Sequence, residues 1–271
     1  MSGGPAVSAD SRKSGSLAGV EHLALSAALM PPAGQSVLIA VSGGADSLAL
    51  LDLLLLDGRW PVTVWHLDHG IRTDAGADLA AIRALLARHD VTVEVIAERA
   101  DIPALARQWR CSLETAGRRH RYARLAAVAA ERGISAVVTA HHRDDQAETV
   151  LANLLRGADE TGRAGIPPRR RLAEGVDLVR PLLAISRQKL RDHLASRGIT
   201  WSEDATNADV RHRRNRLRHE VLPALERDRP GITAALVDLS TRAQAAVGRA
   251  DERLSPQWND AFNGERVTLT A

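Results

Sequence analysis

The chain has 271 residues, of which 45% are hydrophobic and 25% charged, a balance typical of a globular protein with one large core or two smaller ones. Its apolar runs are all shorter than the roughly 20 residues that cross a bilayer, and residues 1–18 lack the apolar segment of a secretory signal, so we expect a disordered tail there. One cysteine, Cys111, excludes an intrachain disulfide and, from this chain alone, a cysteine-built zinc or iron–sulfur centre, which favours a cytoplasmic protein.

The positive charge is concentrated in the second half of the chain. The net charge is +3, but residues 160–229 hold 16 Lys and Arg against 10 Asp and Glu. Nearly all of these cations are arginines, whose forked guanidinium suits phosphate and base recognition. This distribution indicates either a nucleic-acid partner or an arginine-rich composition without functional meaning.

Strand-like and helical runs alternate along the first half. We expect strands at 36–41, 61–67, 91–96 and 134–139, and helices at 46–57, 74–89, 112–132 and 144–156. This alternation predicts an α/β fold, a doubly wound parallel sheet of the Rossmann-like type with helices on both faces. The run from Val37 to Val41 has no polar residue, as expected of a buried central strand.

The second half begins with a stretch rich in Gly, Pro and Arg. We expect a loop over 157–179, including three consecutive arginines at 169–171, which suit either a nucleic-acid contact or a mobile solubilising loop. Helices follow at 186–197, 211–228 and 231–254, and residues 264–271 look like a strand cut short, so we expect the chain to end within a longer protein. The predicted domains are the tail at 1–18, an α/β domain at 19–215 and a helical extension at 216–271.

A loop of small residues follows the first predicted strand. Two glycines permit positive φ and close backbone approach, and the next helix presents its positive end, so the loop predicts an anion site of phosphate size. Asp46 does not suit a phosphate and would hold Mg²⁺ or cap the helix. A plain turn with a helix cap is the alternative. The predicted phosphate-binding residues are Ser42, Gly43, Gly44, Ala45, Asp46 and Ser47.

Histidines and carboxylates gather after the fourth predicted strand. They are His141, His142, Asp144, Asp145 and Glu148. Asp145 and Glu148 are three residues apart on one helix and so share a face. Such groups suit recognition of a cation and proton transfer. A divalent metal site and a helix with a capped, acidic first turn are the alternatives.

The loop Ser-Gly-Gly-Ala-Asp-Ser resembles the PP-loop of the ATP pyrophosphatases. Four further stretches, "HLDHGIR" (66–72), "LETAGRRHRYARL" (113–125), "TAHHRDDQAETVLANLLRG" (139–157) and "RRNRLRHEVLPAL" (213–225), make the chain similar to the tRNA(Ile)-lysidine synthetase family. The resemblance implies a fold of the adenine nucleotide alpha hydrolase type. It also implies a ligase that adenylates C2=O of the wobble cytidine in tRNA(Ile) with a CAU anticodon, using ATP and Mg²⁺. The ε-amine of lysine then displaces AMP to give lysidine, which changes decoding from AUG to AUA.

The resemblance also implies roles for individual residues. Asp145 and Glu148 would recognise lysine, and Arg214, Asn215 and Arg218 would contact tRNA or close the active site. Asp46 would hold Mg²⁺. The residues expected at the chemistry are Asp46, Arg118, Arg121, His141 and Asp145, with the choice between Arg118 and Arg121, and between His141 and Asp145 as the base, left open.

The sequence also suggests roles for residues 66–72 and leaves other functions open. We interpret His66 as a packing residue, Asp68 as a turn residue and Arg72 as a phosphate contact. The family also suggests a homodimer. A related tRNA thiolase is the nearest alternative, but those related to 2-thiocytidine formation need several cysteines. A non-catalytic nucleotide-binding protein would need only the phosphate loop, and a plain RNA-binding module only the basic face.

Overall fold

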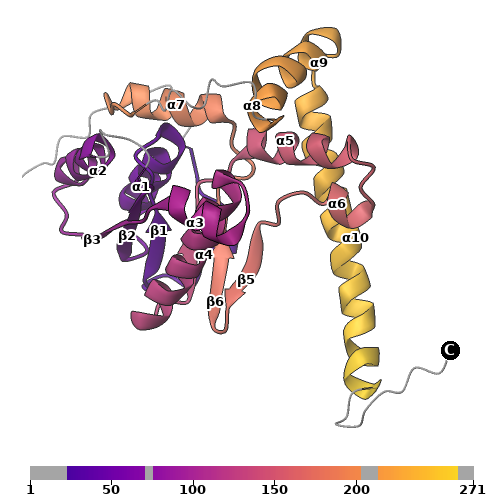
Figure 1. The fold of residues 1–271 in the computed structure, drawn as a ribbon, viewed down its shortest axis with the longest axis horizontal. Helices are drawn as coiled ribbons and strands as arrows, with labels where there is room; N and C mark the ends of the chain where they lie inside the picture. The colour runs from indigo at the N-terminus through magenta and orange to yellow at the C-terminus, as the bar shows by residue number, and fades with distance from the viewer. Residues whose placement is uncertain (1–22, 71–75, 203–212, 262–271) are drawn as a thin grey trace, which may run out of the picture.

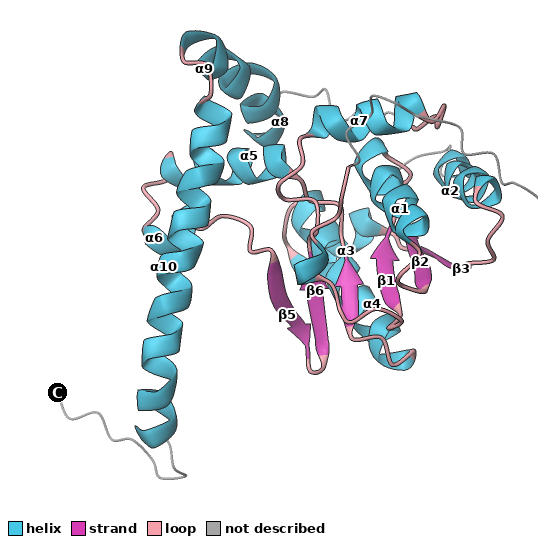
Figure 2. Ribbon diagram, turned by 180° about the vertical axis from the view of Figure 1, so that it is seen from behind, coloured by secondary structure: helices cyan, strands magenta, loops and turns pink. Residues whose placement is uncertain are grey.

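The computed structural model describes residues 23–70, 76–202 and 213–261, with side chains up to residue 249. Its centre is a six-stranded sheet in the order β3-β2-β1-β4-β6-β5 (Figure 2). All neighbouring strands are parallel except β5, which runs antiparallel to β6. The predicted doubly wound α/β fold is confirmed. The strands are β1 (Val37–Ala40), β2 (Val62–Asp68), β3 (Glu94–Arg99), β4 (Ala136–Val138), β5 (Arg169–Ala173) and β6 (Val176–Val179).

Helices surround the sheet and form a separate group beyond one edge (Figure 1). Every helix predicted from periodicity between residues 46 and 197 is present. The helices are η1 (Ala27–Leu29), α1 (Ala45–Asp57), α2 (Gly76–Arg88), α3 (Ile102–Trp109), α4 (Leu113–Glu131), α5 (Arg143–Leu154), α6 (Glu160–Arg163), α7 (Arg187–Ser196), α8 (Arg213–Arg216), the π-helical turn η3 (Leu217–Val221), α9 (Leu222–Asp228) and α10 (Ile232–Ala261).

The two faces of the sheet bury separate cores, because successive residues of a strand point to opposite sides. Val37 and Ile39 of β1 pack into one cluster with residues of α1, α2 and α7. Leu38, between them, packs into the other cluster, with Trp65 and residues of α4 such as Leu125. These three residues of β1 are fully buried, so β1 is the buried central strand that its composition predicts.

A buried carboxylate joins the helices on the first face. Asp52 of α1 is wholly inaccessible to solvent. It lies 2.7 Å from Nε2 of His89, just after α2, and 2.7 Å from Nε2 of His193 on α7. Arg197, just after α7, adds a third contact at 2.8 Å. One side chain of α1 therefore connects α1 to both neighbouring helices.

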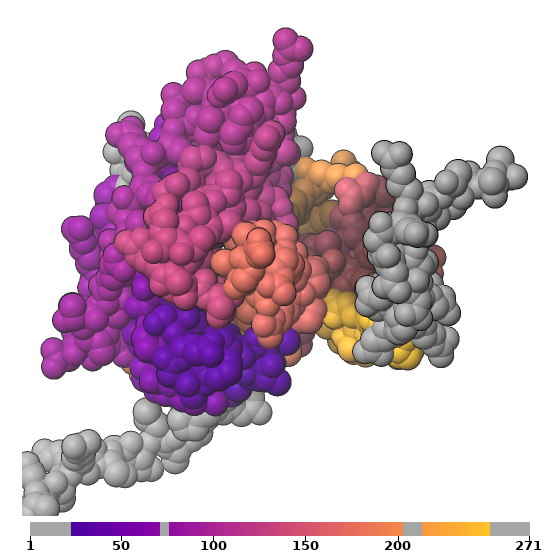
Figure 3. Space-filling model, turned by 90° about the horizontal axis from the view of Figure 1, so that it is seen from below, coloured from indigo at the N-terminus to yellow at the C-terminus, as the bar shows by residue number. Residues whose placement is uncertain are grey.

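The helices after residue 213 share a third core with α5. Leu217, Leu222 and Leu236 pack against Ala147 and Val150 of α5. Viewed from below, α10 lies beside the main body rather than over the sheet (Figure 3). The predicted boundary between residues 215 and 216 stays a prediction.

Two parts of the chain differ from prediction. The expected loop at 157–179 is wrong, because it contains α6 and the β5–β6 hairpin, so the arginines at 169–171 lie in an edge strand. The hairpin forms because Val176 and Val179 are buried and Asp177 pairs with Arg169 and Arg171 across the strands. Helix α3 is not indicated by the sequence pattern. The expected helix at 211–228 is present from residue 213 as an unbroken run of α8, the π-helical turn η3 and α9. The predicted tail at 1–18 and strand at 264–271 lie outside the described residues.

Candidate active site

A cavity of about 460 Å³ opens at the carboxyl edge of the sheet. Side chains from five separate parts of the chain line it: the end of β1 with the loop after it, the end of β2 with His69, the first half of α4, the β4–α5 junction and the segment from α8 to η3. In parallel α/β sheets this edge is where ligands bind. Its polar lining residues include Ser42, Asp46, Ser47, His69, Glu114, Arg121, Tyr122, Thr139, His141, Asp145, Arg214, Asn215 and Arg218.

The loop at 42–47 is held by its own serines. The Ser42 N–H donates to Ser47 Oγ at 3.1 Å, and Ser47 Oγ donates to the Gly44 carbonyl at 2.9 Å. Gly44 is the N-cap of α1 and no side chain caps this helix end, so the positive end of α1 faces the cavity without a competing carboxylate cap. Gly43 has φ +85°, and a Cβ there would lie 2.6 Å from Cβ of Asp78. Both the conformation and the space require glycine at this position.

Asp46 does not cap α1, which removes one of its two predicted roles. Its Oδ2 lies 3.3 Å from Nε2 of His142. Its Oδ1 is buried and accepts no hydrogen bond from any residue that the structure describes. A buried carboxylate oxygen without a donor, in the first turn of α1 and at the edge of the cavity, fits a ligand of a hard divalent cation.

His142 connects this loop to α5. It is fully buried and is the N-cap of α5, where the Asp145 N–H donates to its Nδ1 at 3.3 Å and its own N–H donates to Asp145 Oδ2 at 3.2 Å. Because Nδ1 accepts a hydrogen bond, the ring proton lies on Nε2, which faces Asp46. The sequence pattern left a helix with a capped, acidic first turn as an alternative to a functional site. The structure contains this helix start, and it lies within the site. The spacing His-x-x-Asp of a capping box is the sequence signal that could have singled out His142.

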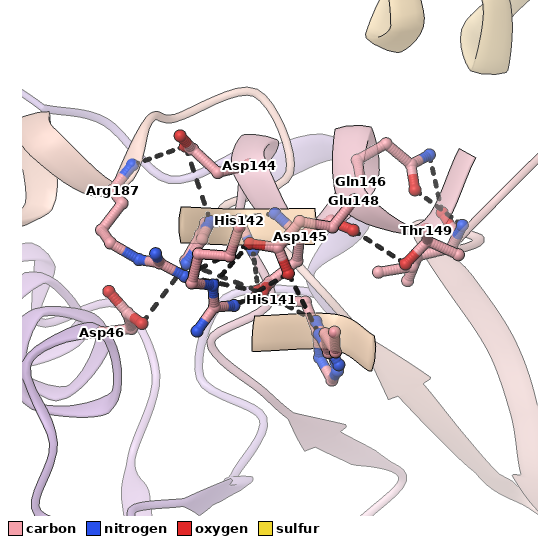
Figure 4. Close-up of polar contacts among 12 residues, drawn as sticks. Asp46, His141, His142, Asp144, Asp145, Gln146, Glu148, Thr149 and Arg187 are labelled. Atoms are coloured by element: carbon pink, nitrogen blue, oxygen red, sulfur yellow. Dashed lines mark hydrogen bonds and ion pairs between the residues drawn. The ribbon is translucent and has the colours of Figure 1, made fainter. Parts of the chain in front are cut away.

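Asp145 and Glu148 converge as predicted, but their partners are arginines of this chain (Figure 4). Glu148 is 2% exposed and accepts from Arg218 Nε at 2.6 Å and from Arg214 Nε at 3.0 Å. Asp145 Oδ1 accepts from Nη2 of the same two arginines, at 3.1 and 2.8 Å. Arg187 of α7 lies 3.8 Å from Glu148. We call these five residues the acid–arginine cluster; it holds three cations and two carboxylates.

The charges of the cluster control two neighbouring pKa values. Burial raises the pKa of Asp145, but His142 and Arg214 outweigh it and hold the value at about 2. Burial lowers the pKa of His141 to about 3, and Arg180 and Arg214 add to this effect against the opposing charge of Asp145. His141 lines the cavity, and its Nδ1 is 3.0 Å from Thr139 Oγ1. At neutral pH His141 is therefore uncharged and Asp145 is ionised.

The two candidate arginines of α4 occupy different positions. Arg121 lines the cavity, and burial lowers its pKa, a sign of a cation placed in a poorly solvated position. Arg118 is exposed and lies outside the cavity lining, with its guanidinium 5.0 Å from the centre of the Tyr122 ring. The structure therefore places Arg121, and not Arg118, in the cavity wall.

The structure also tests the interpretations of His66, Asp68 and the metal alternative. His66 is buried with Nδ1 2.9 Å from the Val41 carbonyl, and Asp68 accepts from the Gly70 N–H at 2.8 Å, so both are structural as expected. Arg72 lies outside the described residues. Within the described ranges no three His, Cys, Asp or Glu side chains are arranged to hold a metal ion, so the transition-metal alternative has no support there. None of the described helices is both long and apolar enough to cross a membrane.

Comparison with known proteins adds a family and a set of relatives. The family model of the PP-loop domain matches residues 21–225. A tRNA(Ile)-lysidine synthase of Symbiobacterium thermophilum is 45% identical over 71% of this chain and 40% of its own length. One of Geobacter sulfurreducens is 42% identical over 75% of this chain and 43% of its own length. The chain thus spans about two fifths of the length of these curated relatives.

Solved structures share the fold at low sequence identity. The U34-tRNA thiolase NcsA of Methanococcus maripaludis superimposes with a TM-score of 0.63 over 79% of this chain and 73% of its own, at 17% identity. This likeness shows a common fold.

Proposed function

Since this chain belongs to the PP-loop domain family, we propose that it catalyses the ATP-dependent ligation of lysine to C2 of the wobble cytidine in tRNA(Ile) with a CAU anticodon. This ligase reaction forms a C–N bond and converts ATP to AMP and pyrophosphate. One observation carries the proposal beyond the family: a single cavity joins a phosphate-sized loop to a cluster that contains both carboxylates and guanidinium groups. The name of the relatives, tRNA(Ile)-lysidine synthase, supports the same reaction.

The loop at 42–47 would bind the phosphates of ATP. Its serines and the start of α1 supply hydrogen-bond donors and a positive field. Asp46 would hold Mg²⁺ through its unpartnered Oδ1, and the bound cation neutralises phosphate charge. Arg121, which lines the cavity, would stabilise the negative charge that develops on the phosphate as pyrophosphate leaves.

The acid–arginine cluster suits a zwitterionic amino acid. Free lysine carries an α-ammonium and an α-carboxylate, and the cluster offers a partner for each. Asp145 and Glu148 would take the ammonium, while Arg214 or Arg218, released from the acid pair, would take the carboxylate. An exchange of this kind keeps every buried charge paired, which a cluster of one sign alone would not achieve.

His141 is the proposed proton acceptor for the attacking ε-amine. It lines the cavity and is uncharged, whereas both oxygens of Asp145 already accept hydrogen bonds. The pKa of about 3 would rise when an anionic phosphate binds nearby, since a negative neighbour favours the charged imidazole. Asp145 would then act on the chemistry by holding the cluster and His142 in place.

Two of the three residues predicted to contact tRNA are ion-paired within the acid–arginine cluster. Arg214 and Arg218 pair with Asp145 and Glu148, and Asn215 lines the cavity between them. Of the two roles predicted for this segment, these contacts support closure of the active site over the ligand more than binding of a distant part of the tRNA backbone. A cytoplasmic location and a homodimer stay predictions.

A tRNA thiolase is the second candidate from the sequence, and one feature of the site argues against it. The structural neighbour named above is a thiolase solved with an iron–sulfur cluster. The cavity of this chain has no cysteine in its lining, and Cys111 is the only cysteine in the sequence. A thiolate-bound cluster therefore has no ligands at this site.

The test is pyrophosphate release from ATP and Mg²⁺ with tRNA(Ile) bearing CAU, with each amino acid added in turn. We expect release that depends on this tRNA, with lysine alone incorporated into it. Release without tRNA, driven by another carbonyl acceptor, would retain the ATP chemistry and overturn the proposed substrate. A tRNA(Met) with the same anticodon is the matched control for tRNA identity.

A further inference from the structure

The three arginines of β5 lie on two opposite faces of the sheet. Arg169 and Arg171 lie on one face of the sheet, 2.6 and 3.3 Å from the carboxylate of Asp177 on β6. Arg170, between them, points to the opposite side and reaches α4, where its guanidinium lies 4.9 Å from the centre of the Tyr122 ring. The alternation of a β-strand therefore separates one arginine from its two neighbours.

Tyr122 is surrounded by arginines. Arg118, from the same helix, lies 5.0 Å from the ring centre, and Arg170 lies 4.9 Å from it. Arg180, which directly follows β6 and is 1% exposed, places a third positive charge beside Tyr122 and donates to the Pro167 carbonyl. Burial raises the pKa of Tyr122, but the charges of Arg118 and Arg180 outweigh it and hold the value below the usual one.

The arginines around Tyr122 have no carboxylate at ion-pair distance among the described residues, although some arginines of the same elements do. On α4, Arg124 pairs with Glu98, and on β5 both neighbours of Arg170 pair with Asp177. A cluster of cations without counter-ions is unfavourable in the free protein, since like charges repel. Such a cluster becomes favourable when a ligand supplies the negative charge.

The position of the arginines around Tyr122 indicates which ligand they bind. Tyr122 lines the cavity, but Arg118 and Arg170 lie outside its lining. The nucleotide phosphates already have the 42–47 loop and Arg121 inside the cavity. A ligand that meets Arg170 must therefore extend out of the cavity across Tyr122. An RNA strand does this, because it carries a phosphate at every nucleotide and bases that stack on aromatic and guanidinium planes.

We propose that Arg170 and Arg118, held over Tyr122, bind the RNA backbone phosphate next to the nucleotide that enters the cavity, and that Arg169 and Arg171 take no part. This inference rests on the proposed function, because it assumes an RNA substrate in this cavity. It assigns the entry side of the RNA to the edge between α4 and β5.

The test compares neighbouring arginines of one strand. The dissociation constant of tRNA(Ile) with CAU is measured for the whole chain at several salt concentrations, for wild type, Arg170→Ala and Arg171→Ala. Loss of one phosphate contact should reduce the slope of log Kd against log salt by about 0.7–0.9, so we expect this change in Arg170→Ala. Arg171→Ala should keep the wild-type slope, since Arg169 still pairs with Asp177.

Two further variants separate charge from folding. Arg170→Lys keeps the charge and should keep the wild-type slope. Arg170→Gln removes the charge and should reduce the slope as Arg170→Ala does. Thermal unfolding is recorded for each variant. Equal slopes for wild type, Arg170→Gln and Arg171→Ala would overturn the phosphate contact even if the tRNA is bound and modified. If the wild-type chain binds no tRNA at all, the proposed function itself is wrong, and this inference with it.

Discussion

Nε2 of His142 lies 3.3 Å from Oδ2 of Asp46, so the N-cap of α5 faces the carboxylate of the phosphate loop. The same imidazole accepts the Asp145 N–H through Nδ1, and Asp145 holds Arg214 and Arg218. A continuous chain of polar contacts thus runs from the loop at 42–47 to the acid–arginine cluster. The proposed nucleotide and lysine sites share one buried histidine.

Asp46→Asn should lower the rate of pyrophosphate release more than about 100-fold, because even loss of a partner that only orients a metal ligand commonly costs 10–100-fold. The reason is the loss of the unpartnered carboxylate oxygen that would hold Mg²⁺. The measurement is the rate as a function of Mg²⁺ concentration. Asp57→Asn, which removes a surface carboxylate from the other end of α1, is the control. A wild-type rate in Asp46→Asn would remove Asp46 from metal binding.

Gly43→Ala should destabilise the chain and weaken ATP binding. The residue has φ +85°, and the added Cβ would lie 2.6 Å from Asp78 Cβ. Strain at positive φ costs about 1–2 kcal/mol and overpacking about 1–3 kcal/mol more. Gly58→Ala, at φ +68° with open space around it, isolates the strain. Urea unfolding and ATP titration of both variants test this, and equal losses would mean that the contact with Asp78 relaxes freely.

Glu148→Ala should reduce the free energy of unfolding by about 3–5 kcal/mol, because it leaves two guanidinium groups with Asp145 as their one remaining carboxylate partner. In the same variant the KM for lysine should rise by about tenfold or more and that for ATP much less. The control is Glu220→Ala, whose exposed pair with Arg216 should contribute only about 0–1 kcal/mol. Equal increases in both KM values would contradict the lysine assignment.

Asp52→Asn should lower stability by about 3–5 kcal/mol at neutral pH, since it removes the charge that pairs with Arg197 and faces two histidines. Burial raises the pKa of Asp52, but the hydrogen bonds of His193 and His89 outweigh it, so the folded value lies below 3.8. A depressed carboxyl pKa stabilises the fold above the unfolded value, and this contribution is lost as pH falls through the folded value. Urea unfolding between neutral pH and pH 3 should therefore show the two proteins converging only below about pH 4. A difference that disappears already near pH 6 would contradict this account.

The sequence predicts those parts of the fold that depend on local pattern. The run around Ile39 is apolar at every position, so its place in the sheet centre follows from composition. The convergence of Asp145 and Glu148 follows from helical spacing, and the place of Asp46 from the rule that ligands bind at the carboxyl ends of parallel strands.

The remaining features depend on contacts between distant residues. Arg214 and Glu148 are 66 positions apart, and nothing in either local pattern indicates that they pair. The sequence pattern does not predict strand β5, because its three arginines contradict strand propensity. Asp177 on β6 pairs with two of them, and Arg170 lies over Tyr122. His141 and His142 are neighbours in the sequence, but only His142 is the N-cap of α5. His142 therefore connects the 42–47 loop to α5, whereas His141 lines the cavity.

The contact between Asp52 and His193 also affects how the chain folds during synthesis. The two residues are 141 positions apart, so at about 5–20 residues per second α1 waits roughly 7–28 s for its partner on α7. Until then, the face of α1 that packs on α7 is uncovered, and Asp52 has no ion pair with α7. The nascent chain is therefore most exposed to aggregation and to chaperone binding before α7 leaves the ribosome. Completion of the first core is the last event in this part of the fold, although it involves one of its earliest helices.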